Sequence, residues 1–149
     1  AGPALVLGAG GAARAVVHAL LTAGVPEIRL VNRDMAKTAW FADRFGRRIQ
    51  PAAWDYRSML LGGANLVVNT TSLGMQGHAA LDLALDTLPP TALVHDIVYA
   101  PLETDLLARA PLRLAFQLLA LRLPERLASL GQLAQRFRLR EQGLLAMSL

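Results

Sequence analysis

A glycine-rich turn in residues 4–14 constrains the fold more than any other feature of the sequence. Four apolar residues lead into Gly8, Gly10 and Ala13, and an apolar helical pattern continues to about Ala23. In this G-x-G-x-x-A spacing the first glycine permits a tight turn out of a buried strand. The second lets the backbone approach a pyrophosphate, and the small third residue lets the helix pack on the strand. The stretch therefore predicts a dinucleotide-binding turn, with an ordinary strand–helix connection as the alternative.

The order of the expected elements indicates the fold class. After the first strand and a helix over about 11–23, we expect further elements at about residues 27–31, 35–45, 49–53, 56–61, 66–69, 92–96 and 103–109. Strands alternating with helices predict parallel pairing through right-handed crossovers. The prediction is a doubly wound, mostly parallel Rossmann-type α/β sheet with helices on both faces. We expect this domain to span residues 1–108.

The last part of the chain, residues 109–149, differs in charge. It carries seven Arg against two Glu, whereas residues 1–108 carry eight basic and nine acidic residues, so the net charge of +4 comes from the tail. Two amphipathic segments, 112–123 and 125–137, predict two helices separated by Pro124, which cover the sheet or offer a Leu-rich surface to a partner. Because aromatic residues are not interleaved with the arginines, we favour a solvated face over nucleic-acid binding.

Several function classes are disfavoured by composition. The chain has no cysteine, which excludes disulfides, thiolate metal sites and a cysteine nucleophile. Its three histidines show no metal-ligand spacing, and no apolar run reaches the roughly 18 residues that span a bilayer. We find no secretory leader pattern. The expectation is a cytoplasmic protein with no metal and no nucleic-acid or membrane partner.

The end of the second expected strand, Asn32 to Asp34, lies where dinucleotide-binding folds select their cofactor. An acidic residue there would accept hydrogen bonds from the ribose of NAD and repel an added phosphate. This chain has Asn32 there, then Arg33, with Lys37 one helical turn further on, and these cations suit a 2′-phosphate. Asp34 adds a negative charge nearby, and it also fits the N-cap of the next helix. Both interpretations can hold, and we favour NADP over NAD.

Polar residues follow two later strands. Residues 69–75, Asn-Thr-Thr-Ser-Leu-Gly-Met, come after the strand at 66–69, where open α/β sheets place their ligands. These hydroxyls could line a cofactor groove or form an internally bonded loop. Tyr99 follows the strand at 92–96 and could donate a hydrogen bond to a ligand or simply pack. The sequence does not support a Ser/His/Asp triad.

Four motifs occur together and in order: Gly8–Ala12, Asn32-Arg33 with Lys37, Asn69–Met75, and Asp96-Ile-Val-Tyr99 with Pro101-Leu-Glu-Thr104. Over residues 4–108 this set resembles the C-terminal NADP-binding domain of shikimate dehydrogenase. The resemblance implies reduction of 3-dehydroshikimate by NADPH to shikimate, a step of the shikimate pathway toward chorismate and aromatic amino acids.

The resemblance also implies roles for individual residues. The pyrophosphate would be held by Gly8, Ala9, Gly10, Gly11 and Ala12, and the 2′-phosphate by Asn32, Arg33, Asp34 and Lys37. Thr71 and Ser72 would border the cofactor, Ile97 would lie near the nicotinamide, and Tyr99 would contact the substrate. Asp34 replaces the hydroxyl residue that is commoner in the family.

Two departures limit what the resemblance implies. The family's catalytic Lys and Asp belong to an N-terminal domain that precedes a linker like Ala1-Gly2-Pro3, and the sole lysine here, Lys37, is already assigned to the phosphate. The family's Asp-Gly-x-Gly-Met-Leu stretch does not follow Arg109, so Gln117 cannot be assigned a substrate role. We therefore expect no catalytic residue in this chain, and NADP binding without turnover.

Alternatives stay open at this point. The substrate of the complete protein could be quinate instead of shikimate, and a homodimer is left open. Another NADP oxidoreductase, such as one resembling glutamyl-tRNA reductase, shares the glycine turn and the Asn-Arg pair. A non-catalytic nucleotide-binding or interaction module, working through the tail, is the remaining hypothesis.

Overall fold

The computed structural model of the chain describes residues 2–115. Contacts between Cα atoms divide the chain into two units, Ala1–Phe116 and Gln117–Leu149. The helix expected over 125–137 and most of the helix expected over 112–123 lie outside the described residues.

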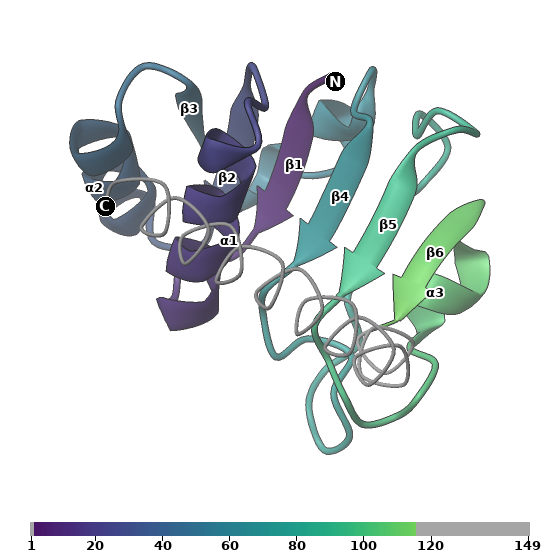
Figure 1. The fold of residues 1–149 in the computed structure, drawn as a ribbon. Coiled ribbons are helices and arrows are strands. Elements are labelled where there is room, and N and C mark those ends of the chain that lie inside the picture. Colours follow the sequence, from purple (N-terminus) through teal and green to yellow (C-terminus); the bar gives the residue numbers. More distant parts are fainter. Residues whose placement is uncertain (1, 116–149) are drawn as a thin grey trace, which may run out of the picture. The chain divides into compact units, whose positions relative to one another are not determined.

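Residues 2–115 form a six-stranded parallel sheet with the strand order β3-β2-β1-β4-β5-β6 (Figure 1). The strands are β1 (Ala4–Leu7), β2 (Ile28–Asn32), β3 (Ile49–Ala53), β4 (Leu66–Asn69), β5 (Leu93–Asp96) and β6 (Leu112–Ala115). The helices are α1 (Gly11–Thr22), α2 (Met35–Phe45) and α3 (Asp105–Arg109), with short 3₁₀ turns at Trp54–Tyr56 and Met59–Leu61. The predicted doubly wound parallel fold is confirmed.

The sheet is buried on both faces, as its central strand shows. Ala4 and Val6 of β1 pack in a cluster with residues of α1 and α2, whereas Leu5 and Leu7 pack in a second cluster with residues of α3. Alternate side chains of a strand point to opposite faces, so helices cover both sides of the sheet. A continuous apolar run of this kind is typical of a central parallel strand.

The strand order reverses between β1 and β4. Chain progression moves outward from β1 to β2 and β3, and then resumes on the other side with β4. Because all strands run in one direction, their carboxyl ends meet at one edge (Figure 1). A crevice at such a reversal is the usual ligand position in open α/β sheets.

One expectation is wrong for the residues just after α3. The amphipathic pattern predicts a helix from residue 112, but residues 112–115 form β6, which pairs in parallel with β5 from Leu93↔Leu112 to Asp96↔Ala115. Leu-Arg-Leu-Ala alternates with a period of two, and backbone pairing along the open edge of β5 favours a strand. The sheet thus extends beyond residue 108, the predicted limit of the domain.

No helix within residues 2–115 is long and apolar enough to cross a membrane.

Candidate cofactor-binding site

The turn after β1 requires glycine at its first position. Gly8 has a φ of +98°, and a Cβ placed on it would lie 2.9 Å from Cγ2 of Thr71 and 3.0 Å from Oγ1 of Thr70. The Thr70 hydroxyl donates a 2.7 Å hydrogen bond to the Leu7 carbonyl, so the loop after β4 is held against this turn. Any larger residue at position 8 would push the two loops apart.

The second glycine of the motif faces open space. Gly10 is exposed, and a Cβ added there would meet no atom within 4 Å. Gly10 is also the N-cap of α1, and no side chain caps that end of the helix. The amides of the first turn are therefore available to an anion, which the positive end of the helix dipole also favours.

The segment after β2 is shaped by local hydrogen bonds. Asn32 Nδ2 donates to the Asp34 carbonyl at 3.1 Å, and Asp34 Oδ1 accepts from the Ala36 amide at 3.0 Å. Asp34 is thus the N-cap of α2, as one of its two interpretations predicts. Its carboxylate engages its own helix, while Arg33 and Lys37 form no hydrogen bond or ion pair with any described residue.

These loops enclose a pocket of about 220 Å³ at the strand ends. It is lined by eight of the predicted cofactor residues, namely Gly8, Ala9, Gly10, Asn32, Arg33, Lys37, Thr71 and Ser72. Trp54, Thr70 and Leu73 complete the lining. We call this the strand-edge pocket.

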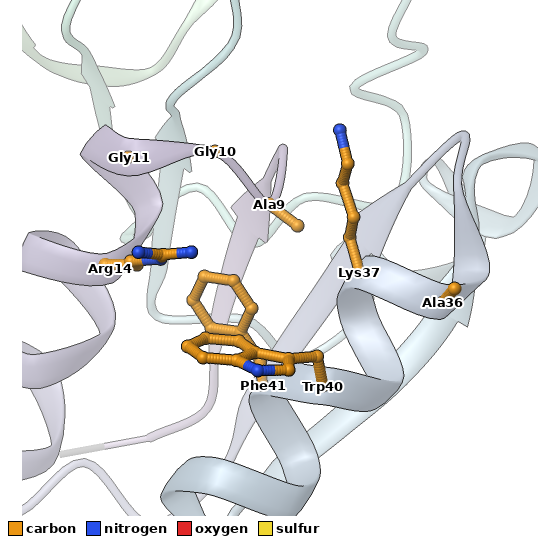
Figure 2. Close-up of a pocket in the computed structure, with 8 residues that line it drawn as sticks. All are labelled: Ala9, Gly10, Gly11, Arg14, Ala36, Lys37, Trp40 and Phe41. Carbon is orange, nitrogen blue, oxygen red and sulfur yellow. The ribbon is translucent and has the colours of Figure 1, made fainter.

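A second pocket, of about 420 Å³, lies between α1 and α2, and we call it the interhelix pocket (Figure 2). Ala9, Gly10 and Lys37 line both pockets, so the two are contiguous. Arg14 of α1 and Trp40 of α2 contribute its largest side chains, with the Arg14 Cζ 4.7 Å from the centre of the indole. Over the part of the chain that the structure covers, no acidic side chain lines either pocket.

The loops after β4 and β5 are joined by buried polar side chains. Asn69 Nδ2 donates to Asp96 Oδ1 at 3.0 Å, and Thr104 Oγ1 donates to Asp96 Oδ2 at 2.7 Å. The Val98 amide donates to Asp96 Oδ1 at 3.0 Å, and the Thr71 hydroxyl donates to Asn69 Oδ1 at 2.7 Å. Asn69, Asp96 and Thr104 are each at most 1% exposed. This polar cluster fixes the rim of the strand-edge pocket through Thr71.

Of the other predicted residues, Gly11 lines the interhelix pocket, whereas Ala12, Asp34, Ile97 and Tyr99 line neither pocket. Ala12 is exposed on the first turn of α1, and Ile97 is half-buried against the apolar cluster below α1 and α2. Tyr99 follows β5 and is 60% exposed. Their contacts with cofactor or substrate stay predictions. Among residues 2–115, no group of three or more His, Asp or Glu side chains could hold a metal ion.

Comparison with known proteins places this arrangement in a family. The family model described as shikimate/quinate 5-dehydrogenase matches residues 2–75. An NADP(+) shikimate dehydrogenase of Paramagnetospirillum magneticum is 57% identical over 112 residues, which are 75% of this chain and 41% of that protein. The chain belongs to the shikimate dehydrogenase family. It spans about two fifths of the length of the curated relatives it matches.

Solved structures of this family share the fold. Quinate dehydrogenase from Corynebacterium glutamicum in complex with NAD has a TM-score of 0.66 at 29% identity, over 71% of this chain and 39% of that one. Shikimate 5-dehydrogenase from Thermus thermophilus, in complex with NADP(H) and shikimate, has a TM-score of 0.57 at 38% identity, over 70% and 38%. Structural relatives of this dehydrogenase family thus include complexes with either nicotinamide cofactor.

Sequence reasoning missed the aromatic residues of both pockets and Arg14. Trp40 and Trp54 are the chain's only tryptophans, and each lines one pocket. Arg14 ends the stretch that carries the glycine motif, so its position just inside α1 was the available signal. Its pairing with a residue of α2 has no sequence signature.

Proposed function

We propose that this chain is the NADP-binding part of a shikimate dehydrogenase and that, by itself, it binds NADPH without reducing 3-dehydroshikimate. The observation that carries the proposal is the strand-edge pocket, which Arg33 and Lys37 line together with the glycine turn, and whose described lining contains no acidic side chain. An acidic residue at this position would favour NAD, whereas two cations favour a 2′-phosphate.

The residues present fit the cofactor. Gly10 leaves open space beside the uncapped N-terminus of α1, which suits a pyrophosphate. Asn32, Arg33 and Lys37 lie on the β2 side of the same pocket, which suits the phosphorylated ribose. Thr71 and Ser72 border the pocket from the β4 side. Ile97 and Tyr99 follow β5, on the side where we place the nicotinamide and the substrate.

When bound, NADPH supplies a hydride to the carbonyl carbon of a ketone, whose oxygen must then take up a proton. Lys37 lines the pockets beside the glycine turn, and we assign it to the phosphate. We assign the proton donor to a part of the enzyme other than these pockets. The described residues bind and orient the cofactor, and the polar cluster at Asp96 holds the loops that border it.

Parallel titrations of the 149-residue chain with NADPH and with NADH test the binding proposal. We expect tighter binding of NADPH, and a preference that weakens as salt rises, because exposed cations are screened. Equal affinity for the two cofactors, or tighter binding of NADH, would contradict it. No loss of NADPH absorbance is expected with 3-dehydroshikimate; measurable turnover would contradict the proposal that the chain alone is inactive.

Quinate stays a second candidate substrate for the complete enzyme, because the matching family model covers both dehydrogenases and one structural relative is a quinate dehydrogenase. A homodimer is likewise a proposal, which sedimentation analysis of the purified chain would test.

A further inference from the structure

The interhelix pocket contains a cation that the proposed function does not use. Arg14 projects from α1 and lies over the indole of Trp40 on α2, with 4.7 Å between Cζ and the ring centre (Figure 2). This distance is within the range of a cation–π interaction. The pair joins two helices that flank the glycine turn, and it forms one wall of a cavity of about 420 Å³.

The position of Arg14 is restrained by aromatic side chains of α2. The Trp40 ring packs edge-on against Phe41 and Phe45, with ring centres 5.3 Å and 6.3 Å apart. Phe41 is itself 1% exposed, so the aromatic group is anchored in the core. A guanidinium stacked on such a ring loses little further side-chain freedom when it binds an anion.

The hydrogen-bonding edge of Arg14 has no acceptor among residues 2–115. Stacking covers the face of the guanidinium plane, while its N–H groups lie in that plane and can donate to a phosphate. Lys37 comes from α2 on the other side of the pocket (Figure 2), and the lining contains no acid within the described range. The cavity therefore has the charge of an anion site.

We propose that Arg14, held by Trp40, is a third cationic residue for the 2′-phosphate of NADP, in addition to Arg33 and Lys37. This inference rests on the proposed function. The interhelix pocket shares Ala9, Gly10 and Lys37 with the strand-edge pocket, so a group on the ribose can extend from one into the other. The α2 side of this pocket includes Ala36 and Lys37, and α2 begins directly after the Asn32–Asp34 segment to which we assign cofactor selection. This placement favours the 2′-phosphate over the pyrophosphate.

The test compares the NADPH and NADH affinities of three variants that each lose one positive charge. Arg14→Gln should weaken NADPH binding about tenfold and NADH binding less than about twofold, as expected for loss of a charged phosphate contact. Arg33→Gln should likewise lower the ratio of NADPH affinity to NADH affinity. Arg44→Gln is the matched control, because Arg44 is exposed on α2 and lines neither pocket. It should leave the ratio unchanged.

The outcomes separate this inference from the proposed function. If the wild-type chain does not prefer NADPH, the proposed function fails. If it does, and Arg33→Gln reduces the preference while Arg14→Gln does not, the role of Arg14 alone is overturned. Equal losses for both cofactors with Arg14→Gln would also overturn it, since they would indicate a pyrophosphate contact.

A second pair of variants tests the pocket without removing a charge. Trp40→Phe keeps an aromatic ring under Arg14, whereas Trp40→Leu removes it. We expect Trp40→Leu to lower the preference for NADPH about threefold, and Trp40→Phe to retain most of it. If Trp40→Leu retains the wild-type preference and circular dichroism shows it folded, Trp40 does not position Arg14.

Discussion

The two pockets beside α1 and the polar cluster at Asn69, Asp96 and Thr104 differ in how their polar groups are partnered. Arg33 and Lys37 are exposed and form no hydrogen bond or ion pair within the described range, whereas every buried side-chain nitrogen or oxygen atom among the described residues has a hydrogen-bond partner. Exposed cations remain hydrated and cost the folded state little, but a buried carboxylate without donors would be costly. Charges of the pockets should therefore govern binding, and those of the cluster should govern stability.

The largest effect is expected from Asp96→Ala. The substitution would leave the donors of Asn69, Val98 and Thr104 without their acceptor in a buried site. We expect the free energy of unfolding to fall by about 3 kcal/mol or more, measured by urea denaturation. The control is Asp82→Ala, because the Asp82 side chain is 95% exposed in its ion pair with Arg57. Similar decreases in unfolding free energy for both variants would show that the buried cluster contributes no more to stability than an exposed ion pair.

Gly8→Ala and Gly10→Ala test whether the glycine turn contains one position that governs stability and another that governs cofactor binding. Gly8 has a positive φ and would place its Cβ against Thr71, so Gly8→Ala should lower the free energy of unfolding by about 2 kcal/mol. Gly10 has space for a Cβ, and its φ of −95° suits any residue, so Gly10→Ala should change stability by less than about 0.5 kcal/mol. It should still weaken NADPH binding in a titration, because the methyl group would occupy the approach to the backbone. Unchanged NADPH affinity with Gly10→Ala would contradict the role of Gly10 in cofactor binding.

Asp34→Ala should lower stability less than Asp96→Ala or Gly8→Ala, and it tests where the binding region ends and the structural region begins. Loss of the cap on the Ala36 amide should cost about 1 kcal/mol of unfolding free energy. NADPH affinity should stay the same or rise slightly, because a negative charge near the phosphate site is removed. Asp34→Asn is the control, since asparagine also caps helices. Clearly weaker NADPH binding by Asp34→Ala would indicate that Asp34 contacts the cofactor directly.

Much of the fold follows from local patterns. The predicted limits of α2, β3 and β4 coincide with the observed ones, because Gly46 ends α2 and branched apolar residues mark β4. The glycine turn and the Asn32–Lys37 segment could be assigned to one site, since both follow strands whose carboxyl ends meet at the same edge. The prediction for residues 112–115 was wrong, because it used only the helical spacing of their apolar residues. In the structure these residues pair with β5, a strand distant from them in sequence.

The sequence by itself determined the parallel sheet, the glycine turn and the two cations after β2, because each depends on residues that are neighbours along the chain. Only the tertiary structure decided that Arg14 stacks on Trp40, and that Asn69 and Thr104 converge on Asp96. These contacts depend on how helices pack across the sheet and on the register of β4 against β5. Side-chain periodicity specifies which face a residue occupies, but not which residue of another element it will meet.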